Sequence, residues 1–300
     1  MERLEAAMAK ARAARGDRQL GAETTGVSPA AGSGAKPTPD TLPATLPDTA
    51  PGTAPGTAPQ TVAAADWSVL PSIDISPRQA RAKRINAVLG TEFASQYDIL
   101  RSRVLRQMKD NKWTRLAVTS PRTKSGKTTI SLNLALSLAR NSDQKIILMD
   151  FDMRRPSLAT LLNIKSGPDI AGLLRPSARL TDYAVRFGSN LAICSSRTPV
   201  RNSAELLQSK STKEALDRIE AEWQPDIMIF DTPPMQGNDD NLGFFGHIDC
   251  ALIIAGAGGD TLAQIDRCEQ EVSSLTNVLG TILNKCKYFD KNTGYDSAYY

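Results

Sequence analysis

One short segment, Ser125-Gly126-Lys127-Thr128-Thr129, restricts the fold of this chain more than any other feature. It follows the apolar run 116–118 and opens an apolar-periodic stretch at 130–139, which predicts a strand, a tight loop and a helix in that order. The backbone N–H groups of such a loop face a bound phosphate, a lysine neutralises its charge, and the first threonine hydroxyl holds Mg²⁺. We therefore expect nucleotide contacts from Lys124, Ser125, Gly126, Lys127, Thr128 and Thr129.

The loop departs from the usual pattern. The full form G-x-x-x-x-G-K-[ST] would place its first glycine where this chain has Pro121. A β-carbon at Lys124 disfavours a positive φ angle, if the loop needs one at that position. The segment therefore predicts nucleotide binding and leaves the efficiency of catalysis open.

The first third of the 300-residue chain offers little for a hydrophobic core. Residues 21–65 consist mainly of Gly, Ala, Thr, Pro and Ser, a composition typical of disordered linkers because it has few large apolar side chains to bury. The linker ends in a basic run, Arg78-Gln79-Ala80-Arg81-Ala82-Lys83-Arg84, which is either solvated or in contact with anionic lipid or an acidic partner. We predict a short helix within 1–20, a disordered linker over 21–89, a folded domain over 90–287 and a flexible tail over 288–300.

Composition argues against several classes of protein. The net charge of +4 does not by itself imply nucleic acid, and we expect no specific nucleic-acid partner. The four cysteines are widely spaced without a C-x-x-C pair, as in reduced cytoplasmic proteins, and the lone histidine has no neighbouring ligands. No apolar run approaches the roughly 20 residues that span a bilayer, and the N-terminus is too charged for a secretory signal. We expect a cytoplasmic protein that reaches the inner face of the cell membrane only through a partner or a charged surface.

Short apolar runs alternate with helical patterns through the rest of the chain. The predicted strands are 116–119, 145–149, 191–194, 226–230, 251–255 and 278–283, and the predicted helices are 93–109, 129–140, 203–222 and 261–276. Strands that are apolar throughout and separated by helices indicate an α/β fold with a parallel sheet sandwiched by helices. Ligands of such sheets bind beyond the carboxyl ends of the strands.

Acidic residues directly follow two of these strands. The strand 145–149 precedes Asp150-Phe151-Asp152, and the strand 226–230 precedes Asp231-Thr232-Pro233-Pro234. A single aspartate at a strand end usually caps the next turn. Here the phosphate loop and both aspartate segments meet at one edge of the sheet, where Mg²⁺ on a triphosphate needs oxygen ligands. Phosphoryl transfer at such an edge needs mainly positioning and charge neutralisation.

These motifs resemble those of a known family. The segment Ile146-Ile147-Leu148-Met149-Asp150-Phe151-Asp152-Met153-Arg154-Arg155-Pro156 resembles the second Walker motif of bacterial tyrosine kinases, the cytoplasmic autokinases of exopolysaccharide and capsule export. Asp231-Thr232-Pro233-Pro234 resembles their Walker B motif, and further matches at 204–207 and 278–284 keep the same order. The resemblance covers residues 93–287 and implies a P-loop NTPase fold of the deviant Walker A class.

The resemblance also implies roles at the matching positions. Lys127 would bind the β- and γ-phosphates of ATP, and Asp150 would accept the proton of an incoming tyrosine hydroxyl. Thr128, Asp152 and Asp231 would hold Mg²⁺, directly or through water. Asn284 resembles an adenine-contacting asparagine of related ATPases. The implied catalytic residues are Lys127, Asp150 and Asp152, and the implied cofactors are ATP and Mg²⁺.

The C-terminal end of the sequence is rich in tyrosine. Four of the six tyrosines fall in the last 13 residues, at Tyr288, Tyr295, Tyr299 and Tyr300. Family autokinases end in such a cluster, which a neighbouring subunit phosphorylates, so the resemblance implies that these four are phosphoacceptors. The other interpretation is a chance tyrosine-rich tail. Each phosphate would add nearly two negative charges and release a tail that is docked on a basic surface.

Departures from the family pattern keep three functions open. The loop lacks the usual Pro-Gly-x-Gly-Lys glycine, and of the ring-forming motif Glu-x-x-Arg-x-x-Arg only Arg101 remains, so homo-oligomerisation is left open. The first function is a tyrosine autokinase activated by a membrane polysaccharide co-polymerase. The second is an ATP-binding pseudokinase that regulates such a co-polymerase. The third is a ParA- or MinD-like switch ATPase, although the chain lacks the Lys-Gly-Gly loop of that group.

Overall fold

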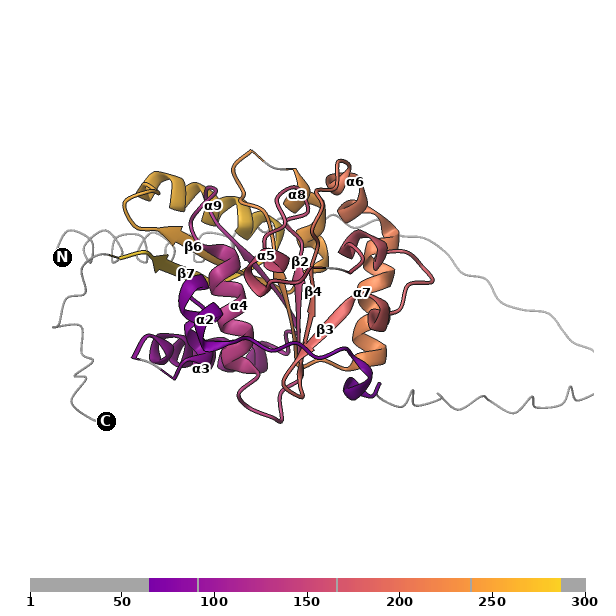
Figure 1. Ribbon diagram of the computed structural model, residues 1–300. Helices are drawn as coiled ribbons and strands as arrows, with labels where there is room; N and C mark the ends of the chain where they lie inside the picture. Colours follow the sequence, from indigo (N-terminus) through magenta and orange to yellow (C-terminus); the bar gives the residue numbers. More distant parts are fainter. Residues whose placement is uncertain (1–64, 91, 166, 238, 287–300) are drawn as a thin grey trace, which may run out of the picture. The chain divides into compact units, whose positions relative to one another are not determined.

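The computed structural model describes residues 65–90, 92–165, 167–237 and 239–286, and in these residues seven strands form one sheet (Figure 1). The strands are β1 (Arg115–Thr119), β2 (Ile146–Asp150), β3 (Ala184–Phe187), β4 (Leu191–Cys194), β5 (Ile227–Asp231), β6 (Cys250–Gly256) and β7 (Asn277–Asn284). The helices are α2 (Pro77–Lys83), α3 (Glu92–Asn111), α4 (Lys127–Leu138), α5 (Leu158–Leu162), α6 (Ser203–Gln208), α7 (Lys210–Trp223), α8 (Asp240–Phe244) and α9 (Leu262–Leu275).

The sheet has the order β3-β4-β2-β5-β1-β6-β7 and is parallel except at one edge, where β3 runs antiparallel to β4. Successive side chains of a strand point to opposite faces, and both faces are buried. In β5, Ile227 and Ile229 face the layer of α2, α3, α4 and α5, whereas Met228 and Phe230 face the layer that contains α6, α7, α8 and α9 (Figure 1). The predicted parallel sheet between two helical layers is confirmed.

The strand register brings the predicted functional segments to one edge. Asp150 of β2 pairs with Asp231 of β5, and Asp231 also lies in register with Val118 of the neighbouring strand β1. The loop between β1 and α4 begins at the residue after Thr119. The phosphate loop and the two aspartate segments therefore emerge side by side from the three adjacent strands β2, β5 and β1.

Several elements differ from the prediction. The edge strand β3 and the short helices α5 and α8 were not predicted. The predicted helix 203–222 is two helices, α6 and α7, because Ser209 between them has an extended backbone. The Ser209 side chain accepts the Thr212 N–H and begins α7.

The linker prediction is wrong for residues 65–89, which are part of the folded body. Trp67, Leu70 and Ile85 are buried, since the first two pack in the core on the α7 side of the sheet and the third in the core on the α4 side. Within this segment α2 has Ser76 as its N-cap and a proline at its first position. A few well-placed large apolar residues therefore fix a segment whose overall composition is polar.

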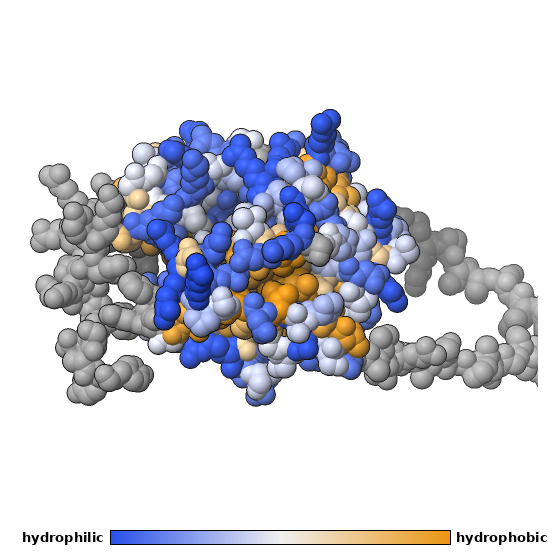
Figure 2. All heavy atoms as spheres, in the orientation of Figure 1, coloured by the Kyte–Doolittle hydropathy of each residue, from blue (hydrophilic) through white to orange (hydrophobic). Residues whose placement is uncertain are grey.

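The predicted helix within 1–20, the linker up to residue 64 and the tyrosine-rich tail 288–300 lie outside the described residues. Among the described helices, none has the length and apolar character needed to cross a bilayer. The cysteines are free thiols, three of them buried. Figure 2 shows that the face in view is mostly hydrophilic, with an apolar patch near its centre.

Candidate nucleotide site

The phosphate loop adopts the conformation that its glycine permits. Gly126 has a φ of 98° and directly precedes α4, whose first residue is Lys127. A β-carbon at Gly126 would lie 2.4 Å from Asn284 Nδ2, so no other residue fits there without displacing Asn284. Lys124 has a φ of 66°, which shows that the loop does require a left-handed residue where this chain carries a β-carbon. That conformation costs about 1 kcal/mol in a non-glycine residue.

Asp260 holds one side of the phosphate loop in place through hydrogen bonds. Its Oδ2 accepts hydrogen bonds from Ser125 Oγ at 3.0 Å and from the Gly256 N–H at 2.6 Å. Its Oδ1 lies 4.0 Å from Arg122 Nε, and Arg122 also donates to the Gly259 carbonyl at 3.1 Å. Sequence analysis missed this role, because Asp260 follows two glycines in a turn that matches no recognised motif. Its position shortly after the strand predicted at 251–255 was the available signal, since ligands of a parallel sheet bind beyond the carboxyl ends of its strands.

Asn284 holds the other side of the phosphate loop in place through hydrogen bonds. Its Nδ2 donates to the Ser125 carbonyl at 2.9 Å, and its Oδ1 accepts the Lys285 N–H. The Lys285 ammonium in turn donates to the Lys124 carbonyl. The side-chain amide that was predicted to contact adenine is thus engaged with the loop backbone, and adenine contact stays a prediction.

Lys127 brings a buried positive charge close to Asp152 and Asp231. Its side chain is 7% exposed, and its Nζ lies 3.9 Å from Asp152 Oδ2. Burial raises the pKa of Asp152, while the Lys127 charge lowers it. Asp152 has a side chain that is 13% exposed, whereas Asp150 and Asp231 are fully buried. Of these three carboxylates, that of Asp152 is the most accessible from solvent.

Asp231 is a buried carboxylate with one unsatisfied oxygen. Its Oδ1 accepts a hydrogen bond from Ser131 Oγ at 3.1 Å, and its Oδ2 has no hydrogen-bond partner among the described residues. Burial raises the pKa of Asp231 to about 6, although the charge of Lys127 and the hydroxyls of Thr128 and Ser131 lower it. A buried acceptor without a donor is costly, and a metal ion or its bound water would supply the missing partner.

Asp150 is fully buried beneath the start of α5. Its Oδ2 accepts the N–H groups of Ser157 at 3.0 Å and Leu158 at 2.9 Å, and its Oδ1 has no partner in the part of the chain described. Burial and the neighbouring Asp231 raise the pKa of Asp150 well above its usual range. Ser157 Oγ also donates to Thr128 Oγ1 at 2.9 Å. The start of α5 therefore covers Asp150, which was predicted to face a tyrosine hydroxyl.

Two further contacts fix the aspartate segments. Arg154 forms ion pairs with Asp239 and, at 3.0 Å, with the buried Asp240, whose other oxygen accepts Ser203 Oγ. In the layer that contains α8, the rings of Phe151, Phe230 and Phe244 form a cluster with centroids 4.7–5.3 Å apart. Phe151, which follows Asp150, and Phe230, which precedes Asp231, are thus held in place by aromatic packing.

The donor set fits a phosphate-bound Mg²⁺ better than a metal held by protein alone. Lys127, Thr128, Asp152 and Asp231 lie together as predicted, but no group of three or more His, Cys, Asp or Glu in the described ranges is arranged to hold a metal ion. Mg²⁺ usually takes one or two carboxylates and completes its shell with water and phosphate oxygens. The predicted phosphoacceptors Tyr288, Tyr295, Tyr299 and Tyr300 lie outside the described residues.

Comparison with known proteins agrees with this geometry. Residues 113–299 match the ParA family, described as NUBPL iron-transfer P-loop NTPase. The chain is 27% identical over 214 residues to the tyrosine-protein kinase YwqD of Bacillus subtilis. The aligned region covers 69% of this chain and 88% of that protein. It is 28% identical over 171 residues to the tyrosine-protein kinase etk of Escherichia coli K12, but spans only 23% of that longer protein.

Solved structures show the same relationship. The kinase domain of the Escherichia coli tyrosine kinase ETK has a TM-score of 0.54 and 26% identity, over 63% of this chain and 75% of that one. The chimerical protein CapA2B2, at 20% identity and a TM-score of 0.61, shares the fold over 72% of this chain and 93% of that one. The chain therefore belongs to the ParA family of P-loop NTPases, among relatives that are bacterial tyrosine-protein kinases.

Proposed function

We propose that this protein is an ATP-dependent protein-tyrosine kinase that phosphorylates tyrosines of its own C-terminal tail and so regulates exopolysaccharide or capsule synthesis and export. The observation that carries the proposal is the meeting of Lys127, Asp152 and Asp231 beside a glycine-pinned phosphate loop. The tyrosine-kinase relatives support the choice of tyrosine as acceptor. A switch ATPase of the ParA or MinD type is not better supported, because the relatives with curated names are tyrosine-protein kinases.

The chain's own residues would divide the work as follows. When bound, Mg²⁺–ATP supplies the phosphoryl group and neutralises the charge that develops on it. Lys127 and the backbone N–H groups at the start of α4 bind the phosphates. Thr128, Asp152 and Asp231 hold the metal, and Asp231 Oδ2, which has no partner in the described residues, is ready to accept a donor or a cation.

Asp150 remains our proposed base for the tyrosine hydroxyl, with one added condition. Ser157 and Leu158 cover it in the structure, so the start of α5 must withdraw before a hydroxyl reaches the carboxylate. Burial and the neighbouring Asp231 raise the pKa of Asp150, and a carboxylate with a raised pKa is a stronger base.

Kinetics of two variants test this division. With a tail peptide as substrate, Asp150→Asn should lower kcat by about 100-fold or more and leave the KM for ATP nearly unchanged, since a general base typically contributes that much. Asp152→Asn should raise the Mg²⁺ concentration needed for half-maximal rate. An Asp150→Asn enzyme with unchanged kcat would refute the assignment of the base.

We further propose a membrane polysaccharide co-polymerase as activator, with the kinase at the inner face of the membrane through that partner. The support is the family resemblance. A second function, an ATP-binding pseudokinase, is favoured by one observation: Lys124 occupies a left-handed position that glycine usually fills. ATP binding without tail phosphorylation, even beside the activator, would identify this second function.

A further inference from the structure

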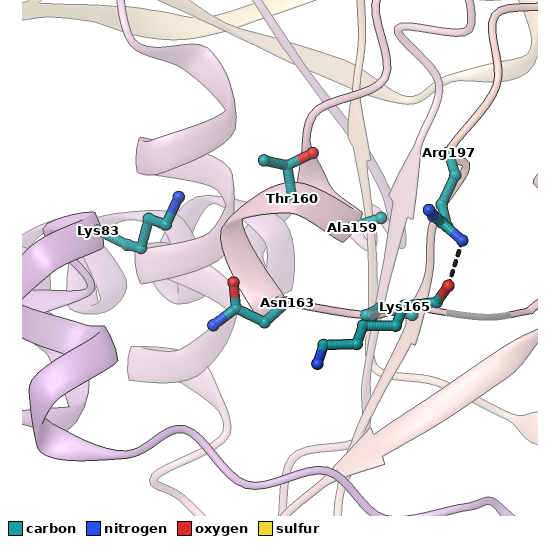
Figure 3. Close-up of a pocket in the computed structure, with 7 residues that line it drawn as sticks. Lys83, Ala159, Thr160, Asn163, Lys165 and Arg197 are labelled. Carbon is teal, nitrogen blue, oxygen red and sulfur yellow. Dashed lines mark hydrogen bonds between the residues drawn. The ribbon is translucent and has the colours of Figure 1, made fainter.

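A cavity away from the nucleotide site collects positive charge. It has a volume of about 290 Å³ and lies between α2, the C-terminal end of α5 and the segment that follows β4. Figure 3 shows its side chains around the last turn of α5, with Lys83 from α2 on one side and Lys165 and Arg197 on the other. None of the residues assigned to the nucleotide site lines it.

The three cations are not neutralised within the described part of the chain. Neither Lys83 nor Lys165 forms an ion pair there, and one N–H of Arg197 binds the Lys165 carbonyl, which leaves its other donors available. Asp169 also interacts with Arg197: burial raises the pKa of this carboxyl, but hydrogen bonds from Thr198 and the Arg197 N–H, together with the Arg197 charge, hold the pKa below its ordinary value. Asp169 is already occupied by the Arg197 and Thr198 N–H groups and the Thr198 hydroxyl.

Two neutral donors complete the lining. Asn163 ends α5 in a left-handed conformation, with its backbone N–H bonded to the Ala159 carbonyl. Its side-chain amide, like the Thr160 hydroxyl one turn earlier, forms no hydrogen bond to the described residues and lines the cavity. Gln79 of α2 donates to the Leu161 carbonyl, which ties the two walls of the cavity together.

We propose that this cavity binds a phosphomonoester, a phosphate group that carries one organic substituent. A phosphomonoester bears between one and two negative charges near pH 7 and three strong acceptor oxygens, which match three cations and two neutral donors. A single carboxylate would leave most of these donors unused. The volume is near the lower limit for small-molecule sites and exceeds what a bare phosphate needs. A concave site also suits a discrete group better than a flat membrane surface.

The position of the cavity gives the ligand access to the helix that covers Asp150. Thr160 and Asn163 lie at the C-terminal half of α5, and Ser157 and Leu158 at its start hold the Asp150 carboxylate. Ligand binding in this cavity does not require the proposed kinase activity, because the donors that line the cavity do not include any residue of the phosphate loop.

Binding measurements on the full chain test the proposal. The probes are inorganic phosphate, phenyl phosphate and a synthetic peptide of residues 288–300 phosphorylated at Tyr295, measured by calorimetry at low salt. All proteins carry Lys127→Met, so that the phosphate loop contributes little. We expect Lys83→Gln with Lys165→Gln to weaken phenyl phosphate binding by about tenfold or more, the size of one lost charge-assisted hydrogen bond. The control Lys109→Gln removes a charge on α3 and should leave the affinity unchanged.

The probes also distinguish the sources of the phosphate. Equal affinity for phenyl phosphate and the phosphopeptide supports a small phosphorylated compound, and much tighter binding of the phosphopeptide supports a phosphorylated tail; an unphosphorylated peptide is the blank. Unchanged binding by the doubly substituted protein would overturn the proposal. So would binding to phosphatidylserine vesicles with none to any phosphomonoester. Neither result depends on whether the protein transfers phosphate.

Discussion

Replacing Asp231 with asparagine should change how the stability of the protein depends on pH. Asp231 is fully buried, with one oxygen that has no partner among the described residues, and burial raises its pKa from 3.8 to about 6. Between these two values the folded protein binds a proton that the unfolded chain has released. The free energy of unfolding therefore falls as pH rises from about 4 to about 6, and this contribution is constant above that range.

The size of the effect follows from the shift. Two pH units correspond to about 3 kcal/mol of free energy of unfolding that wild type loses between acidic and neutral pH. The Asp231→Asn variant has no carboxylate to ionise at this position and keeps this free energy. Its stability relative to wild type should therefore rise by about 3 kcal/mol from about pH 4 to about pH 7. Asp150 adds to the effect in the same direction, because the charge of Asp231 is one cause of its raised pKa.

Urea denaturation at closely spaced pH values measures this difference directly. The control is Asp143→Asn, which removes an exposed carboxylate and should leave the difference from wild type flat across the same range. A flat profile for Asp231→Asn, or one that slopes the other way, would refute the argument that this carboxylate is buried at a cost. Adding Mg²⁺ and ATP should stabilise wild type more at about pH 7 than at about pH 5, since the ionised carboxylate holds the metal.

Two other substitutions test the loop and the folded segment before it. Gly126→Ala places a β-carbon 2.4 Å from Asn284 Nδ2 and should lower ATP affinity by about tenfold or more in a fluorescent-nucleotide titration. Gly90→Ala also changes a left-handed glycine, but nothing lies within 4 Å of its new β-carbon, so ATP affinity should not change. Trp67→Ala removes a buried ring 5.7 Å from the Trp223 ring centroid and should cost about 3–5 kcal/mol in urea unfolding. A cost below about 1 kcal/mol would mean that residues 65–89 contribute little to the fold.

Local patterns in the sequence were enough to predict the central sheet and the edge where the phosphate loop meets the two aspartate segments. Strands β2 and β5 are apolar throughout and end in aspartate, so their place beside the phosphate loop followed from the rule that parallel strands share a carboxyl edge. The loop, Lys127 and its aspartates lie together as expected.

The parts that were missed depend on contacts between distant residues. Strand β3 has four residues, three of them only partly buried, at an antiparallel edge, so its pattern carries little signal. Trp67 lies in a segment of polar composition and is buried because it packs against Trp223 of α7 and donates a hydrogen bond to its carbonyl. Asp260 contacts Ser125 across 135 residues, and no motif encodes that contact. The cover over Asp150 is an exception, because Ser157 and Leu158 are only 7 and 8 residues away, but no recognised motif predicts how the chain turns back after β2.

We infer that the phosphate loop and its aspartates transfer phosphate to the tail. Mass spectrometry of the purified full chain after incubation with Mg²⁺ and ATP, with and without a candidate membrane activator, tests it most directly. We predict phosphotyrosine at one or more of Tyr295, Tyr299 and Tyr300 in wild type and none in Lys127→Met. Tail phosphorylation that persists in Lys127→Met, or its absence from wild type that binds ATP beside the activator, would contradict the claim.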